Sequence, residues 1–166
     1  MGFIAIVGSG AIGGAVAHAL AVRDRVTEVR LIDPAGQVAR GKALDIQQSS
    51  PIDGFSTRLS AAESIEAAVG ADVVVFADAA EGNVEHAGEA GLGLLRHLVR
   101  AGSRAPVLCA GASQRDLVGK AVTDLRLARA QIIGSAPFAL ESALRAMAGL
   151  ALDGSAVEVC LRVVGV

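Results

Sequence analysis

A glycine-rich turn that directly follows a short apolar run limits the fold of this chain more than any other feature. Residues 3–7 read Phe-Ile-Ala-Ile-Val, and residues 8–14 read Gly-Ser-Gly-Ala-Ile-Gly-Gly. An apolar run rich in isoleucine and valine is typical of a parallel strand that helices cover on both faces. From residue 11 to about 22, apolar side chains continue at helical spacing without a proline. The sequence therefore predicts a strand, a tight turn and a helix in direct succession.

The spacing of the glycines in this turn predicts a dinucleotide-binding site. In a G-x-G-x-x-G pattern, Gly8 permits the tight turn, Gly10 lets a pyrophosphate approach the backbone, and Gly13 lets helix and strand pack closely. The first N–H groups of the helix and its positive dipole end would bind the phosphates. The predicted cofactor contacts from this segment are Gly8, Ser9, Gly10, Ala11, Ile12 and Gly13.

An acidic residue at the end of a second apolar run adds to this prediction. Asp33 lies twenty residues after Gly13 and directly follows the run at 29–32. A carboxylate in that position accepts hydrogen bonds from the adenosine ribose and repels a 2′-phosphate, which favours NAD over NADP. The alternative is a turn or helix-capping role for Asp33, because Pro34 and Gly36 follow it.

Composition and charge indicate a single buried domain and exclude several classes of partner. A chain of 166 residues with 52% hydrophobic content suits one globular domain. The net charge is −2 and aromatic residues make up 2%, so neither nucleic acid nor an anionic membrane is an expected partner. No apolar run approaches the roughly 20 residues of a membrane span. No targeting segment is recognisable, and we expect a cytoplasmic location.

The two cysteines show no pattern of a metal site or a redox pair. Cys109 and Cys160 lie far apart in apolar runs, without a C-x-x-C motif. We expect both to be reduced core residues.

Apolar strand-like runs alternate with helical patterns along the whole chain. This alternation predicts an α/β fold: one Rossmann-type, doubly wound parallel sheet over residues 1–166, with about six parallel strands plus a C-terminal strand. The expected strands are 3–7, 28–32, 56–59, 72–77, 106–110, 130–133 and 157–164. The expected helices are 11–23, 36–48, 61–69, 86–101, 113–127 and 138–151.

Local signals place some of the element boundaries. Ser60 with Glu63, and Ser113 with Asp116, have the spacing of a helix N-cap and an acidic third residue. The segment Ser-Pro-Ile-Asp-Gly at 50–54 is predicted to be a turn.

Two further segments are similar to a known family. Residues 41–47 read Gly-Lys-Ala-Leu-Asp-Ile-Gln, and residues 70–75 read Gly-Ala-Asp-Val-Val-Val. Together with the glycine turn, they resemble the NAD-binding half of the lactate and malate dehydrogenase family. The resemblance is good from residue 3 to about 76 and thinner afterwards. It implies NAD as the cofactor and hydride transfer between NAD and a 2-hydroxy acid.

The resemblance also implies cofactor contacts after the fourth and fifth strands. At the end of the fourth strand the family lines the adenine ribose and phosphate with small residues, where this chain has Ala77, Asp78 and Ala79. Because Asp78 introduces an acid at this point, we expect it to weaken cofactor binding. After the fifth strand the family has an Asn-Pro pair near the nicotinamide, where this chain begins with Gly111, so that contact is lost or replaced.

The catalytic positions of the family are altered in this chain. The family polarises the substrate carbonyl with an arginine on a mobile loop, but no Arg or Lys lies between Leu59 and Leu95. A cluster of acids lies there instead, and it would repel an anionic oxo acid. Glu141 stands in place of the family aspartate, and Arg145 lies one position after the expected arginine. The family histidine would come just after Val166.

These departures leave two main hypotheses for function. The first is the NAD-binding half of a malate or lactate dehydrogenase-like enzyme, which lacks the substrate domain and is inactive alone. A small 2-oxo or 2-hydroxy acid would then bind only in the complete protein. The second is a non-catalytic NAD-binding or assembly module of the same lineage. A weaker third is a Rossmann enzyme acting on an uncharged or cationic substrate, which the acidic loop would suit. Uncovered apolar faces favour a homo-oligomer.

Overall fold

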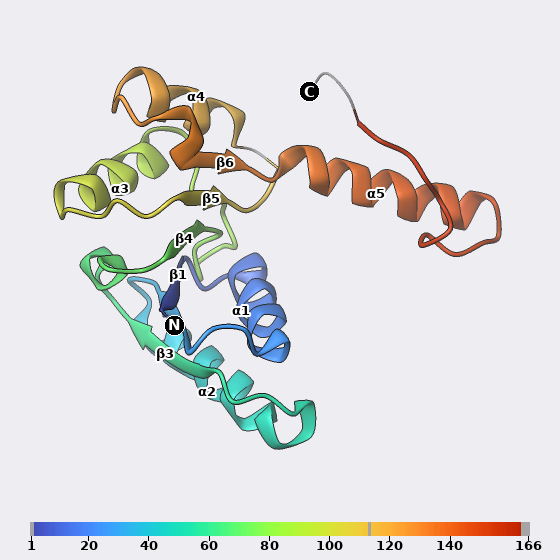
Figure 1. The fold of residues 1–166 in the computed structure, drawn as a ribbon, viewed down its shortest axis with the longest axis horizontal. Coiled ribbons are helices and arrows are strands. Elements are labelled where there is room, and N and C mark those ends of the chain that lie inside the picture. The colour runs from blue at the N-terminus through green and yellow to red at the C-terminus, as the bar shows by residue number, and fades with distance from the viewer. Residues whose placement is uncertain (1, 113, 164–166) are drawn as a thin grey trace.

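A six-stranded parallel sheet forms the centre of the protein, with helices on both faces (Figure 1). The structure is a computed structural model that describes residues 2–112 and 114–163. The strand order is β3-β2-β1-β4-β5-β6. The strands are β1 (Phe3–Val7), β2 (Glu28–Ile32), β3 (Arg58–Ala62), β4 (Val73–Phe76), β5 (Val107–Cys109) and β6 (Ile132–Gly134). The predicted doubly wound α/β fold with six parallel strands is confirmed.

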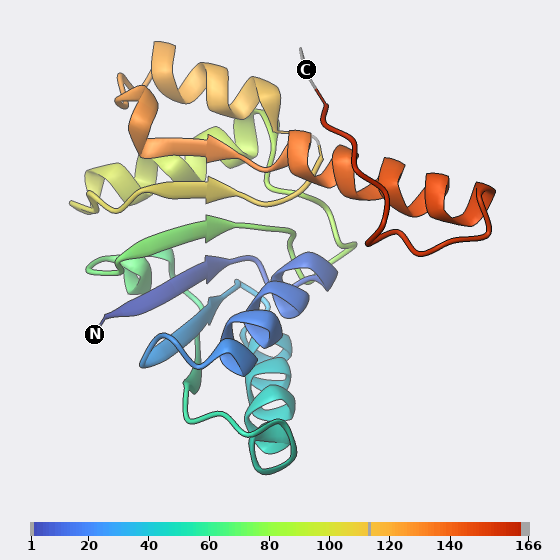
Figure 2. The same cartoon turned by 45° about the vertical axis from the view of Figure 1, so that its right-hand side comes forward.

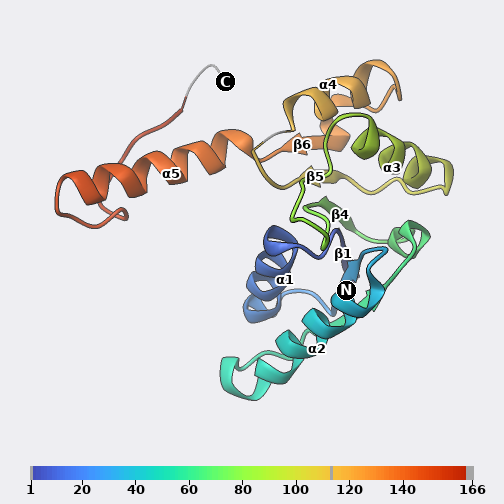
Figure 3. The same ribbon diagram turned by 180° about the vertical axis from the view of Figure 1, so that it is seen from behind.

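The connecting helices divide between the two faces of the sheet. The helices are α1 (Ala11–Arg23), α2 (Gly36–Asp53), α3 (Gly88–Arg100), α4 (Arg115–Thr123) and α5 (Ala136–Ala151), with 3₁₀ turns η1 (Ile65–Ala68) and η2 (Arg129–Gln131). Along β1, the side chain of Ile6 packs with α1 and α2, whereas Ala5 and Val7 pack with η1, α3 and α4. Figure 3 shows the arrangement from behind. Both faces are thus buried, which explains why β1 is apolar throughout.

The strand order reverses between β1 and β4. The chain builds outward from β1 to β3 and then returns to β4 on the other side of β1, so the winding direction reverses at this point. All strands are parallel, and their carboxyl ends therefore lie at one edge of the sheet (Figure 2). Ligands of open α/β sheets bind at such a reversal, outside the carboxyl ends of the strands.

Helix α5 leads away from the sheet and leaves apolar side chains exposed (Figures 1 and 2). Its exposed large apolar residues are Phe138, Leu140, Leu144, Met147 and Leu150. The strand expected at 157–164 is not formed over its described part, 157–163. This segment runs back beside α5, where no strand offers the hydrogen-bond partners that an extended chain needs.

Several expected boundaries are corrected by the structure. The predicted turn at 50–54 is wrong, because α2 continues through Pro51 to Asp53, and the left-handed backbone of the next residue, Gly54, closes the helix. The predicted helix at 61–69 is reduced to η1, because β3 continues to Ala62 to pair with β2. Ser60 therefore lies in a strand and caps no helix.

The remaining local expectations have mixed outcomes. Ser113 lies outside the described residues, and α4 begins after Gln114. Cys109 is a buried free cysteine as expected, and burial raises the pKa of its thiol to about 12. Cys160 is free but exposed, so the expectation of a core position was wrong. In the described part of the chain, no helix combines the length and apolarity needed to cross a membrane.

A buried carboxylate at the start of β2 joins neighbouring strands. Glu28 is 6% exposed, and its carboxylate accepts hydrogen bonds from Arg30 Nη2 at 2.7 Å and Ser60 Oγ at 2.6 Å. Arg58 of β3 also pairs with it. Burial alone would raise the pKa of Glu28, but the hydrogen bonds outweigh that effect and lower the pKa to about 2.

We expect Glu28 to make folding stability depend on pH in the acid range. Because its pKa falls from 4.5 to about 2 on folding, its contribution is present above pH 4.5 and is lost as the pH falls through 2. Glu28→Gln should lower the free energy of unfolding at pH 7 by up to about 3 kcal/mol. Urea unfolding measured from pH 7 to 2 tests this. If the free energy of unfolding of Glu28→Gln falls with pH as steeply as that of the unaltered chain, the prediction is contradicted. Glu81→Gln, at an exposed position, is the control.

The close contact between α1 and the end of β1 predicts a second stability effect. A Cβ atom on Gly13 would overlap the carbonyl oxygen of Gly8, which is backbone and cannot rotate away. We expect Gly13→Ala to lower the free energy of unfolding by about 2 kcal/mol or more. Gly41→Ala is the matched control, because nothing lies within 4 Å of its added Cβ atom and alanine favours α2 by up to about 1 kcal/mol. Denaturant unfolding measures both variants, and an equal change in the free energy of unfolding for Gly13→Ala and Gly41→Ala would contradict the close packing assigned to Gly13.

Candidate functional site

The turn between β1 and α1 lies where the strand order reverses between β1 and β4, and it has the conformation that its glycines predicted. Gly8 has φ +103°, a left-handed value, and its N–H donates to the carbonyl oxygen of Ile32 at 2.7 Å. Gly13 is buried and faces the Gly8 carbonyl, so α1 starts close to β1. The turn therefore points the first N–H groups of α1 toward the carboxyl edge of the sheet.

Asp33 connects three loops at this edge. Its Oδ2 accepts hydrogen bonds from the backbone N–H groups of Ser9 at 2.8 Å and Ala80 at 2.9 Å. Its Oδ1 accepts the N–H of Ala35 at 2.9 Å, which is also a local turn contact. The residue is 2% exposed. Burial alone would raise the pKa of Asp33, but these three N–H groups hold it below its ordinary value, so the side chain is an anion at neutral pH.

The segment after β4 forms a small hairpin, residues 77–86, that closes over the glycine turn. The backbone N–H of Ala79 donates to Val84 at 2.9 Å, and that of His86 donates to Ala77 at 3.0 Å. An antiparallel bridge joins Asp78 to Glu85. We call this segment the acidic hairpin.

Side chains of the acidic hairpin accept hydrogen bonds from the first backbone N–H groups of α1. The carboxylate of Asp78 accepts the N–H of Gly13 at 2.9 Å and the N–H of Ile12 at 3.1 Å. The side-chain oxygen of Asn83 accepts the N–H of Ala11 at 3.0 Å. Asp78 is 1% exposed. The helix N-terminus, which the sequence assigned to a pyrophosphate, thus holds a carboxylate of the chain itself.

The backbone of the predicted dinucleotide site therefore has the expected form, but its phosphate position is filled. A Cβ atom on Gly10 would overlap the carboxylate of Asp78, so the space that Gly10 leaves open is the space that Asp78 uses. Lys42 donates to the Gly10 carbonyl oxygen at 2.6 Å and so neutralises part of the local negative charge. With Asp78 in this place, the turn does not fit a pyrophosphate.

A second carboxylate of the hairpin reaches the end of β5. Glu85 accepts the backbone N–H of Ala112 at 2.9 Å, beside Gly111, whose own N–H donates to Ser135 Oγ at 3.1 Å. Ala77, at the start of the hairpin, is fully buried. The structure thus brings the predicted contacts Ala77, Asp78 and Gly111 to the same edge as the glycine turn.

A small cavity of about 210 Å³ lies beside the end of β2. It is lined partly by Ile32, Pro34 and Leu94, and partly by His86. Burial lowers the pKa of His86, against the attraction of the nearby carboxylates of Asp33 and Asp78. His86 is therefore neutral at pH 7 and presents a largely apolar wall.

The two candidate catalytic residues lie on α5, away from the glycine turn. Figures 1 and 3 show α5 leading outward from the sheet. Arg145 points its Nη2 to the carbonyl oxygen of Val157 at 3.4 Å, within the C-terminal segment. Glu141 is half-buried on the same helix. The structure does not bring either residue to the dinucleotide site.

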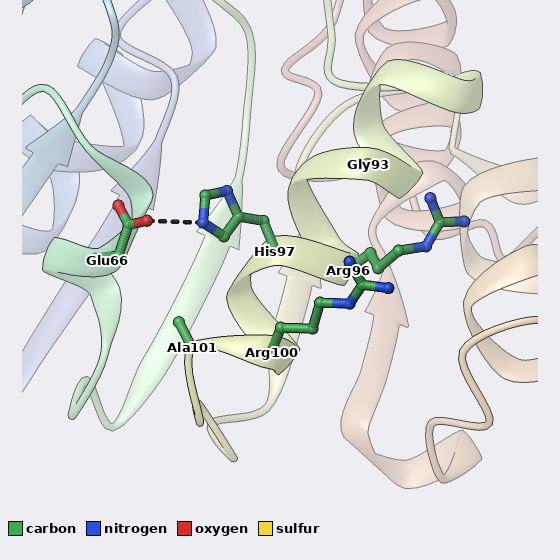
Figure 4. A pocket seen from close by; sticks show the side chains of 6 residues that line it. All are labelled: Glu66, Gly93, Arg96, His97, Arg100 and Ala101. Carbon is green, nitrogen blue, oxygen red and sulfur yellow. Dashed lines mark ion pairs between the residues drawn. The ribbon is translucent and has the colours of Figure 1, made fainter.

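The open depression shown in Figure 4 is separate from the glycine turn and the acidic hairpin. It has a volume of about 630 Å³ and is lined by Arg96 and Arg100 of α3 and by His97, which pairs with Glu66 at 2.7 Å. It lies at the carboxyl end of α3, from which the chain enters the start of β5. The depression is therefore at the sheet edge opposite to the glycine turn and is no part of the dinucleotide site.

Three residues build the site through contacts that the sequence did not predict, although Asn83 and Glu85 belong to the acidic cluster noted there. Ala80, Asn83 and Glu85 act through contacts across more than 25 positions, which no periodicity or motif reveals. The signal that did exist was the acid at Asp78, at a position where small residues are expected.

Comparisons with known proteins agree with this fold. The family described as lactate/malate dehydrogenase, NAD binding domain, matches residues 3–100. The malate dehydrogenase of Pelagibacter ubique is 42% identical over 73 residues, which cover 44% of this chain and 23% of that protein.

Solved structures resemble nearly the whole chain. Malate dehydrogenase from Salinibacter ruber has a TM-score of 0.80 at 23% identity, over 96% of this chain and 53% of that one. Lactate dehydrogenase from Cryptosporidium parvum also has 0.80, at 26% identity, over 98% of this chain and 52% of that one. A further structure of the latter enzyme holds lactic acid and nicotinamide adenine dinucleotide. This chain spans about half the length of these solved proteins.

The family match, the strand order and the position of the glycine turn lead to one assignment. The match covers more than half of the chain, and its residues 3–100 contain both the turn and Asp33. This chain belongs to the NAD-binding domain family of lactate and malate dehydrogenases.

Proposed function

We propose that this chain is the NAD-binding half of a malate or lactate dehydrogenase-like oxidoreductase. In the complete protein, hydride would pass between NAD and a small 2-hydroxy or 2-oxo acid. The observation that carries this proposal is the position of Asp33, whose carboxylate lies at the end of β2 and accepts the N–H of Ser9 in the glycine turn at 2.8 Å. The Cryptosporidium parvum lactate dehydrogenase described with lactic acid and NAD supports it.

Asp33 keeps the capacity to recognise a ribose. A carboxylate has about four acceptor positions, and three of those on Asp33 are used by backbone N–H groups. One position on Oδ1 is left for a ribose hydroxyl. The apolar cavity beside Ile32 and Pro34 would suit the adenine ring. The negative charge of Asp33 would repel a 2′-phosphate, which favours NAD over NADP.

The chain alone would not catalyse hydride transfer. No Arg or Lys between Leu59 and Leu95 is available to polarise a carbonyl, and Glu141 and Arg145 lie on outward-leading α5. Removing such groups costs an enzyme about 10²-fold or more each. The substrate domain would lie in a part of the protein outside residues 1–166.

A non-catalytic NAD-binding or assembly module is the second candidate. It is favoured by the acidic hairpin, whose Asp78 carboxylate fills the phosphate position and whose Glu85 adds negative charge at the same edge of the sheet, where it would repel an anionic oxo acid. Under this alternative the complete protein also lacks turnover.

Self-association is compatible with either candidate function. The apolar side chains that α5 exposes would be covered in a homo-oligomer.

We expect the chain to bind NAD in preference to NADP. Isothermal titration with both nucleotides measures the two affinities. Asp33→Asn keeps the side-chain shape but removes the charge that repels the 2′-phosphate, so the ratio of the two affinities should fall by about tenfold. Asp45→Asn, on the exposed face of α2, is the control. A wild-type preference for NADP contradicts the proposal, and so does a failure to bind NAD that persists when the Asp78 carboxylate is removed from the phosphate position.

Turnover assays separate the two candidate functions and belong to the same test. The chain and the complete protein are each assayed with NADH and either oxaloacetate or pyruvate. Activity of the complete protein with an inactive isolated chain supports the enzyme half. Absence of activity in both supports the non-catalytic module.

We expect light scattering to report a species larger than one chain. Replacement of two exposed apolar residues of α5, Phe138→Ser together with Met147→Ser, should shift the mass toward the monomer, because less apolar area is then available for burial. A clean monomer for the unaltered chain at micromolar concentration contradicts self-association.

A further inference from the structure

We propose that Asp78 determines the dinucleotide affinity of this domain by occupying the phosphate position of the glycine turn. A dinucleotide then binds only when its pyrophosphate displaces the Asp78 carboxylate from the start of α1. This inference rests on the proposed function and deepens it, because it names the group that regulates the same site.

The competition follows from the hydrogen bonds at the helix start. Asp78 bonds to the N–H groups of Gly13 at 2.9 Å and Ile12 at 3.1 Å, and these groups would also hold the pyrophosphate. Each N–H group points to one acceptor at a time. A buried carboxylate beside the phosphates would also repel them strongly, since water screens little charge at a 1% exposed side chain. Pyrophosphate and the Asp78 carboxylate therefore exclude each other.

The rest of the acidic hairpin supports the same occupancy. Asn83 bonds to the N–H of Ala11, so the hairpin supplies acceptors to three N–H groups at the start of α1. The N–H of Ala80 bonds to Asp33 Oδ2 at 2.9 Å and leaves the position on Oδ1 for a ribose hydroxyl. The polar groups of the hairpin therefore reproduce the phosphate half of the contact that a bound dinucleotide makes, and not the ribose half.

Displacing Asp78 requires the hairpin to move as a unit. Its tip has left-handed backbone at Gly82, φ +73°, and Asn83, φ +49°, and is closed by the hydrogen bond from Ala79 to Val84. Asp78 and Asn83 leave α1 together, because both lie on this closed hairpin. The inhibition should therefore act on ligands that carry phosphates and spare adenosine, which needs only the ribose and adenine contacts.

The test compares NAD and adenosine as titrants of the full 166-residue chain and its variants. Asp78→Ser removes the charge and leaves a neutral residue that can still cap a helix, and Asp78→Ala removes the cap as well. We expect NAD to bind both variants about tenfold more tightly than the unaltered chain, with the affinity for adenosine unchanged. Circular dichroism confirms that each variant is folded, and Asp78→Asn is used in place of any that is not.

Glu81→Ala is the matched control, because it removes the same charge from an exposed position of the same hairpin. No gain in this variant, together with the gain in Asp78→Ser, supports the inference. An equal gain of NAD affinity in Glu81→Ala overturns the inference, since the effect would then come from the lower negative charge of the hairpin and not from the phosphate position. Equal NAD affinity in the unaltered chain and Asp78→Ser overturns it and leaves the proposed function standing. Failure of every variant to bind NAD overturns both.

Discussion

The first backbone N–H groups of α1 need hydrogen-bond acceptors, and this need determines how the acidic hairpin lies against the glycine turn. The N–H groups of Ala11, Ile12 and Gly13 have no partner within α1, and the helix dipole adds positive potential at the same point. In this chain Asp78 and Asn83 supply the missing acceptors. The acidic hairpin is held against the glycine turn by these bonds. A site built to bind an anionic ligand is in this way stable without one.

Asp33 extends this network along the carboxyl edge of the sheet. Its carboxylate joins the glycine turn at Ser9, the start of α2 at Ala35 and the acidic hairpin at Ala80. The loops that follow β1, β2 and β4 are therefore fixed to one buried anion. The interpretation of Asp33 as a turn residue is confirmed by its bond to the N–H of Ala35, and its role as a ribose acceptor stays a prediction. The membership of the chain in an NAD-binding family and the bonds of Asp78 to the start of α1 are consistent under the proposal that a dinucleotide and the hairpin compete for the same N–H groups.

Elements with a strong local pattern were predicted with accurate bounds, and elements that depend on distant partners were not. The bounds of β1 and α1 follow from the apolar run and from Gly8, which marks a turn with left-handed backbone. The end of α2 was not predicted, because the sequence from Ser50 onward fits both the start of a turn and a helix that tolerates Pro51 in its last turn. The apolar run after residue 157 looked like a strand, but an extended segment needs a neighbouring strand, and none lies beside it among the described residues.

The sequence by itself determined the parallel fold, the position of the glycine turn and the acid at Asp33, because hydrophobic periodicity and glycine conformation are local properties of the chain. It also marked Asp78 as an unexpected acid. Only the tertiary structure decided that the carboxylate of Asp78 lies on the N–H groups of Ile12 and Gly13, 65 and more positions earlier in the chain. The direction of a side chain at a strand end is set by the loops that close around it. The strand ends of β1, β2 and β4 are brought together by sheet pairing, which no local pattern contains.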